Sequence, residues 1–250
     1  MFPVDSAVPH RYPPFVTWGL VLVNGLAFLY QLSLSPAELE AFLYRWALVP
    51  ARYSDPLWAY ERGLAPDNYL PFLTNTFLHG GWFHILSNMW MLWVFGPAVE
   101  DRLGKVRFLV FYLSAGIGAS IAHALANWDS PIPALGASGA ISGVVGAYVR
   151  LFPRARLIVL VPVLFLPLFF EVPAVLFALI WFLLQLIQGV GQFFAPEIGG
   201  GVAWWAHIGG FVIGWLIVHQ VRRTERRHRR YFADEGKLGF RPDGSWRPRA

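Results

Sequence analysis

The sequence predicts an all-α integral membrane protein with six transmembrane helices, and its composition, apolar segments and charge distribution each support this fold class. Of the 250 residues, 56% are hydrophobic and only 14% are charged, whereas soluble domains carry about 25% charged residues. The mean hydropathy is +0.47. The chain contains no cysteine, which excludes disulfides, thiol catalysis and cysteine-based zinc sites.

Six apolar segments are long enough to cross a bilayer, which takes roughly 20 residues in a helix. They cover residues 14–34, 80–98, 107–126, 136–152, 172–190 and 203–221. The sequence contains no internal repeat, so we expect a single membrane domain over residues 14–221. A cytoplasmic N-terminal segment, 1–13, is expected before it, and a basic, disordered cytoplasmic tail, 222–250, after it.

Basic residues are distributed unevenly among the connections between these segments. Residues 101–107 and 150–156 hold three Lys or Arg each, whereas residues 127–135 and 191–202 hold none. Because basic loops stay on the cytoplasmic side of a membrane, both termini are predicted to be cytoplasmic.

The C-terminal tail is strongly basic, since ten of the 20 Lys and Arg residues follow Val221. A basic segment can bind nucleic acid, but in a multi-pass membrane protein it is more typical of a cytoplasmic end that lies against anionic lipid. We therefore expect the lipid bilayer as a partner and no nucleic acid. The N-terminal sequence lacks the features of a removable signal peptide, which favours a bacterial inner membrane over an organelle.

Two segments outside the six spans also carry structural signals. Residues 35–38 read SPAE, which predicts a helix that begins with a capping box and lies in the membrane interface. Residues 157–170 are apolar, but they would reach only about 21 Å as a helix. Pro162 and Pro167 interrupt this segment, so it is either a re-entrant piece or a surface hairpin on the cytoplasmic side.

Polar side chains inside the spans are functional candidates, because a polar group in hydrocarbon is costly. His84 and Asn88 lie one turn apart on the second span, Ser138 is near the start of the fourth, and His207 is near the start of the sixth. All three spans run from the outside inward in the predicted topology, so these groups are expected at similar depths.

Glycines predict that the fourth and sixth spans pack closely. Gly139 shares a broad helix face with Ser138, and Gly210 and Gly214 share a face with His207; small residues four apart allow helix backbones to approach. This packing would bring Ser138 to His207, and a histidine base can activate a serine nucleophile. Every Asp and Glu lies in a loop, in the tail or at a helix end, so a Ser–His dyad is expected. His84, Asn88 and the Ser138 N–H could bind the oxyanion that acyl transfer generates.

These motifs resemble the rhomboid family of intramembrane serine proteases over nearly the whole chain, from about Thr17 to Val221. The resemblance rests on HGGWFHILSN at 79–88, GPAVEDRLG at 96–104, GASG at 136–139 and AHIGG at 206–210. It implies that Ser138 is the nucleophile and His207 its base, that His84, Asn88 and the Ser138 amide bind the oxyanion, and that His79 lies near a water-filled entrance. Supporting roles are implied for Gly136, Gly139, Gly210 and Gly214.

The sequence departs from the family pattern at two places. Family members often carry a Trp-Arg pair in the first outer loop, where this chain has Leu70-Pro71. Some members also have an aromatic residue one turn after the nucleophile, stacked on the histidine, where this chain has Ser142. His207 is therefore expected to be braced by another side chain, Trp204 or Trp205.

The expected activity is cleavage of membrane proteins near the outer membrane face, where Gly, Ala, Ser or Pro weakens the spanning helix. Two alternatives stay open. A catalytically inactive rhomboid-like scaffold is expected to have lost Ser138 or His207, and both are present. A transporter is less favoured, because no charged residue lies mid-span and no repeat is evident. No metal site is expected, since the pair His79 and His84 lacks the glutamate of HExxH, and no cofactor is expected.

Overall fold

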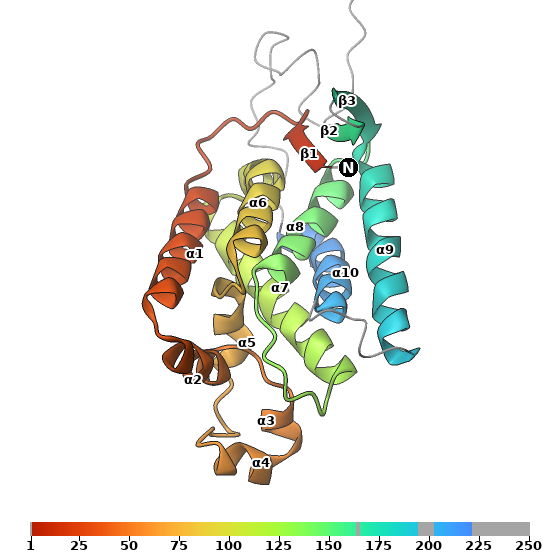
Figure 1. Ribbon diagram of the computed structural model, residues 1–250. Coiled ribbons are helices and arrows are strands. Elements are labelled where there is room, and N and C mark those ends of the chain that lie inside the picture. The colour runs from red at the N-terminus through yellow and green to blue at the C-terminus, as the bar shows by residue number, and fades with distance from the viewer. Residues whose placement is uncertain (1, 164–165, 195–202, 222–250) are drawn as a thin grey trace, which may run out of the picture.

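The computed structural model describes residues 2–163, 166–194 and 203–221, and most of these residues are helical (Figure 1). One long helix occupies each of the six apolar segments. These helices are α1 (Phe15–Ser33), α6 (Trp82–Leu103), α7 (Lys105–Ala126), α8 (Ser138–Leu151), α9 (Ala174–Phe194) and α10 (Trp204–Val221). Among the residues that the structure describes, three helical stretches are long and apolar enough to cross a membrane, namely Phe15–Ser33, Lys105–Ala126 and Ala174–Gln192. The chain is therefore a membrane protein, and its basic tail after Val221 lies outside the described residues.

Short helices form the connection between α1 and α6, and the first of them lie at the end of the molecule opposite the N-terminus (Figure 1). They are α2 (Pro36–Trp46), α3 (Ala51–Ser54), α4 (Pro56–Glu61), α5 (Pro71–Thr74) and the 3₁₀ helix η1 (Asn75–Phe77). The predicted capping box is confirmed, because the Ser35 side chain accepts a hydrogen bond from the Glu38 N–H and the Glu38 carboxylate accepts one from the Ser35 N–H. The Ser35 hydroxyl, which donates to the Glu38 carboxylate at 2.7 Å, and then the Ser35 N–H lower the pKa of Glu38, and the carboxylate favours the N-terminus of α2.

The all-α prediction is wrong at the N-terminal end of the molecule, where three strands form an antiparallel sheet. The strands are β1 (Phe2–Ser6), β2 (Arg156–Val163) and β3 (Leu166–Pro173), in the order β1-β2-β3. The described residues of the segment 157–170 thus pair as two antiparallel strands, in which Pro162 lies opposite Pro167. Pro162 lies near the end of β2 and Pro167 near the start of the edge strand β3; prolines break a helix but are tolerated at strand ends and in edge strands. β3 is largely exposed, including its Phe169 at 60%.

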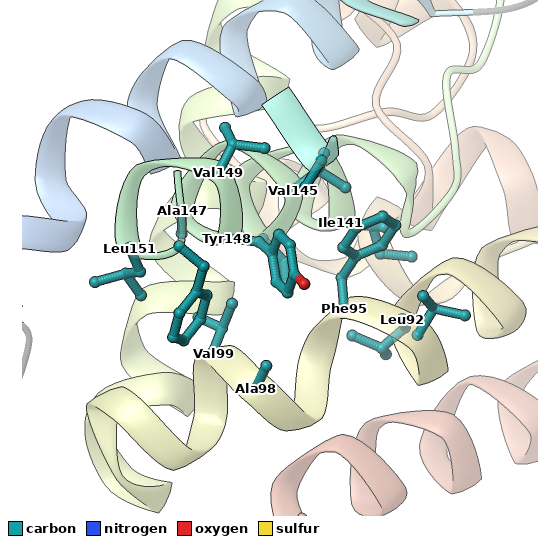
Figure 2. Packing of buried hydrophobic residues seen from close by; sticks show 14 of the residues in the cluster. Leu92, Phe95, Ala98, Val99, Ile141, Val145, Ala147, Tyr148, Val149 and Leu151 are labelled. Carbon is teal, nitrogen blue, oxygen red and sulfur yellow. The ribbon is translucent and has the colours of Figure 1, made fainter. Parts of the chain in front are cut away.

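The hydrophobic core lies largely between α6 and α8, which pack against each other through large side chains (Figure 2). Leu92, Phe95 and Val99 from α6 meet Ile141 and Tyr148 from α8. The Tyr148 hydroxyl lies 2.7 Å from the Ser6 hydroxyl, which ties the end of β1 to α8. The helix α8 therefore has two different faces, a bulky one that meets α6 and the glycine-rich one that remains for α10.

The GPAVEDRLG motif has a structural role at the start of α1. The buried Glu100 carboxylate accepts hydrogen bonds from the Val16 N–H at 3.0 Å and from both the N–H and the hydroxyl of Thr17 at 2.8 Å. Neighbouring Asp101 accepts from the Tyr12 N–H at 3.2 Å. Carboxylates at a helix N-terminus satisfy its free N–H groups and favour its dipole, so α6 holds the first turn of α1 in place.

We expect Glu100→Ala to lower the free energy of unfolding by about 2–4 kcal/mol, because it leaves three donors without their buried acceptor. Glu38→Ala is the matched control, since the Glu38 carboxylate also accepts at a helix N-terminus, from the N-cap residue Ser35, but is exposed, and its loss should cost about 1 kcal/mol or less. Equilibrium unfolding in one detergent would compare the two variants. Equal losses would contradict the role assigned to burial at Glu100.

Candidate active site

Ser138 begins α8 at the end of an extended segment that two backbone contacts hold in place. Leu48 and Ala134 exchange hydrogen bonds of 2.9 and 2.7 Å, and the Gly136 N–H donates to the Asn75 carbonyl at 2.9 Å. Gly136 has a φ of +131°, a conformation that favours glycine. A Cβ atom there would also lie 2.7 Å from His84 Nε2. Glycine is therefore needed both for the turn into α8 and for the space that His84 fills.

The predicted close packing of the fourth and sixth spans is present between α8 and α10. A Cβ atom at Gly210 would collide with the Gly139 carbonyl oxygen, and one at Gly214 would collide with the Gly143 carbonyl oxygen. A Cβ atom at Gly146 would collide with the Phe211 carbonyl oxygen. The two backbones are in direct contact along this seam, which small residues permit.

This contact brings together the two residues singled out as a catalytic pair. Ser138 Oγ lies 2.7 Å from His207 Nε2, within ordinary hydrogen-bond distance. On its other side, His207 Nδ1 lies 2.6 Å from Gln185 Oε1 of α9. Ser142, one turn after Ser138, donates its hydroxyl hydrogen bond to the Ser138 carbonyl at 2.6 Å. Both ring nitrogens of His207 are therefore engaged, one by α8 and the other by α9.

Aromatic side chains from two helices flank the His207 ring. Trp204 approaches edge-on, with ring centroids 6.0 Å apart at 90°, and Trp181 of α9 lies at the same centroid distance with a tilt of 35°. Trp204 was one of two expected braces, whereas Trp181 and Gln185 were missed. A partial signal for Gln185 was available, because the apolar segment 172–190 contains two amides, Gln185 and Gln188, and an amide in a span is the criterion that singled out Asn88; the sequence does not indicate which of the two faces His207.

Two of the predicted oxyanion groups, His84 and Asn88, lie one turn apart on α6, and His84 adjoins the segment that leads into α8. A Cβ atom on Gly136 would meet both His84 Nε2 and the Ser138 hydroxyl, so these two side chains lie around the same point. Asn88, one turn further along α6, is 6% exposed, and its Nδ2 donor has no hydrogen-bond partner within the described ranges. An unpaired buried donor is costly and is common at sites that bind a transient ligand.

His79 is buried behind His84 rather than beside Ser138. Its ring packs edge-on against the His84 ring with centroids 5.1 Å apart, and its backbone exchanges two hydrogen bonds of 3.0 Å with the Gln31 side chain. Burial, with a smaller contribution from His84, lowers the pKa of His79 to about 3. The ring is therefore neutral at pH 7 and supports His84 without adding a charge to the site.

A small cavity lies beside Ser138, between α7, α8 and the connection between α1 and α6. It has a volume of about 20 Å³ and is lined in part by Ser138, Ser120, Asn75 and His123. A cavity of this size can hold one water molecule where its lining offers polar partners, as these four side chains do. Within residues 2–163, 166–194 and 203–221, no three His, Asp or Glu side chains come together in a way that could hold a metal ion.

The arrangement has the parts of an acyl-transfer site. Ser138 can attack a carbonyl carbon once His207 Nε2 accepts its proton. The Ser138 N–H belongs to the first turn of α8, where N–H groups have no partner within the helix. Together with the side chains on α6, it can donate hydrogen bonds to a developing oxyanion.

Comparison with known proteins identifies the family. Residues 66–224 match the rhomboid domain. The chain is 32% identical over 159 residues to the mitochondrial presenilin-associated rhomboid-like protein of Bos taurus, over 60% of this chain and 37% of that protein. It is 34% identical over 114 residues to the putative rhomboid protease YdcA of Bacillus subtilis, over 44% of this chain and 57% of that one. Rhomboid protease GluP of the same organism is 45% identical over 93 residues, over 36% of this chain and 18% of GluP. The chain thus spans less than two thirds of each of these relatives. Because the rhomboid domain covers more than half of its residues, the chain belongs to the rhomboid family.

Proposed function

We propose that this protein is an intramembrane serine protease in which Ser138 is the nucleophile and His207 its base. The observation that carries the proposal is the 2.7 Å contact between Ser138 Oγ and His207 Nε2, on two helices whose glycines allow their backbones to touch. Family membership supports the same reaction class, and two relatives, YdcA and GluP, are named as rhomboid proteases.

The proposed reaction assigns one role to each of these groups. His207 accepts the Ser138 proton as the hydroxyl oxygen attacks the substrate carbonyl, and the Ser138 N–H, His84 and Asn88 donate hydrogen bonds to the oxyanion. His207 then gives its proton to the leaving amine, which leaves an acyl group on Ser138. His207 next removes a proton from a water molecule as its oxygen attacks the acyl carbon, and it then gives that proton to Ser138 Oγ, so that the acyl group leaves as a carboxylic acid and the serine is restored.

In the proposed topology all six long helices cross the membrane, both termini are cytoplasmic and the site opens outward. Three of these helices have the length and hydropathy for a span; α6, α8 and α10 carry the polar site and the glycine seam, which lower their apolar content. Helix α8 has 14 residues and reaches only about 21 Å, so the extended segment before it completes the crossing. A bacterial inner membrane is the proposed location.

The proposed substrates are single-span membrane proteins with Gly, Ala, Ser or Pro near the outer end of the span. A helix hides its carbonyl groups in hydrogen bonds, so a peptide bond must become extended before Ser138 can attack it. Helix-weakening residues reduce the cost of that step by about 1 kcal/mol for a glycine and about 3 kcal/mol for a proline.

Labelling with a fluorophosphonate, a reagent for activated serines, tests the proposed function directly. The purified protein in detergent should be modified at Ser138, and peptide mass mapping would identify the site. An inactive scaffold would stay unlabelled, and a label on another serine would overturn the assignment of the nucleophile.

A further inference from the structure

The second partner of His207 is an amide from a different helix. Gln185 Oε1 lies 2.6 Å from His207 Nδ1, while Ser138 Oγ lies 2.7 Å from Nε2. Gln185 is only 7% exposed and lies on α9, four residues after Trp181, which flanks the same imidazole ring. Residues four apart share one helix face, so one face of α9 meets His207 with both an aromatic wall and a hydrogen-bond acceptor.

The hydrogen-bonding capacity of Gln185 determines which ring nitrogen of His207 carries the hydrogen. An amide oxygen has only acceptor capacity, so the nitrogen that faces it, Nδ1, must carry a hydrogen. A neutral imidazole has one N–H hydrogen, which leaves Nε2 with a free lone pair directed at the Ser138 hydroxyl. This is the tautomer that a general base requires. Without an acceptor at Nδ1, the other tautomer becomes accessible, and that tautomer cannot take the serine proton.

We propose that Gln185 is a positioning residue that fixes the tautomer and the ring orientation of His207, so that Ser138, His207 and Gln185 act as one unit. This inference rests on the proposed protease function. Gln185 occupies the place that an aspartate holds in a Ser-His-Asp triad, but it is neutral and cannot stabilise the imidazolium by charge. Its loss should therefore cost less than the roughly 10⁴-fold seen when a triad aspartate is replaced by its amide.

Three substitutions on α9 distinguish an effect on the orientation of the His207 ring from an effect on side-chain packing. Gln185→Leu keeps most of the volume but removes the acceptor, and it should lower kcat for a reconstituted single-span substrate about 10- to 100-fold with little change in KM, as for partners that orient other functional imidazoles. Gln185→Glu keeps an acceptor and should stay within about tenfold of the wild type. Its acidic limb of the pH–rate profile should move to higher pH, because a carboxylate favours the protonated ring. Gln188→Leu is the matched control, since Gln188 lies on the same helix and is exposed.

The tautomer can be measured independently of activity. In ¹⁵N-histidine-labelled protein, the His207 resonances, assigned by their loss in His207→Ala, should show the hydrogen on Nδ1, and Gln185→Leu should reduce that tautomer. A wild-type spectrum with the hydrogen on Nε2 would overturn the proposal. So would Gln185→Leu kinetics equal to those of Gln188→Leu, or equal losses in the Leu and Glu variants. If the wild type neither cleaved the substrate nor reacted with the fluorophosphonate, the protease function itself would fail, while the spectrum would still report on the contact.

Discussion

Ser138→Ala should abolish cleavage of a single-span substrate reconstituted with the protein in liposomes, and His207→Ala should do the same. The first substitution removes the attacking oxygen, and the second removes the base that lies 2.7 Å from it. Members of a catalytic unit are strongly non-additive, and loss of either a nucleophile or its base costs on the order of 10⁶-fold in a comparable serine protease. The double variant should therefore be no less active than either single variant.

Two controls distinguish loss of chemistry from loss of structure. Ser114→Ala removes an exposed serine from α7, and His219→Ala removes a histidine from the far end of α10; both should cleave at close to the wild-type rate. All four variants should keep the wild-type helical circular dichroism, because each deletes few packing atoms. Wild-type cleavage by Ser138→Ala, with the same bond cut, would reopen the scaffold and transporter alternatives.

The parts of the fold that the sequence predicted well are those set by local composition. The positions of the long helices follow from apolar length, and the largest deviation is at the end of α6, which runs to Leu103 rather than to residue 98. The α8–α10 contact could be predicted from the glycine spacing, because a helix face without side chains allows the backbone of a neighbouring helix to approach closely. Ser138 and His207 could be paired for the same reason.

The missed features depend on contacts between distant parts of the chain. β1 pairs with β2 across about 150 residues, and a short apolar run such as 157–170 has no period that distinguishes a strand from a helix. Glu100 serves the first turn of α1, more than 80 residues earlier. Gln185 was missed because nothing in α9 itself indicates which of its faces meets His207; only the packing of α9 against α10 shows that.

Asn88 should have the next largest effect on turnover. Its buried Nδ2 donor has no partner within the described part of the chain, and it lies one turn after His84, the residue that adjoins Gly136. A donor that binds only the oxyanion stabilises the transition state and not the bound substrate. Its loss therefore lowers kcat and leaves KM nearly unchanged. Asn88→Ala should reduce kcat about 10²- to 10³-fold, as for the loss of one oxyanion donor elsewhere.

The matched control for Asn88 is Asn24, a second buried asparagine in an apolar helix. Its Nδ2 donates to the Leu20 carbonyl at 2.8 Å within α1, so Asn24→Ala should affect stability while kcat stays within about twofold of the wild type. His84→Ala is less informative, because His84 also packs against His79 and fills the space beside Gly136, and its loss combines a missing donor with a cavity.

Separate measurement of kcat and KM for Asn88→Ala decides whether Asn88 binds the oxyanion or the substrate. A rise in KM at constant kcat would mean that Asn88 binds the substrate in its ground state, and the oxyanion would then have to be held by the Ser138 N–H and His84 alone.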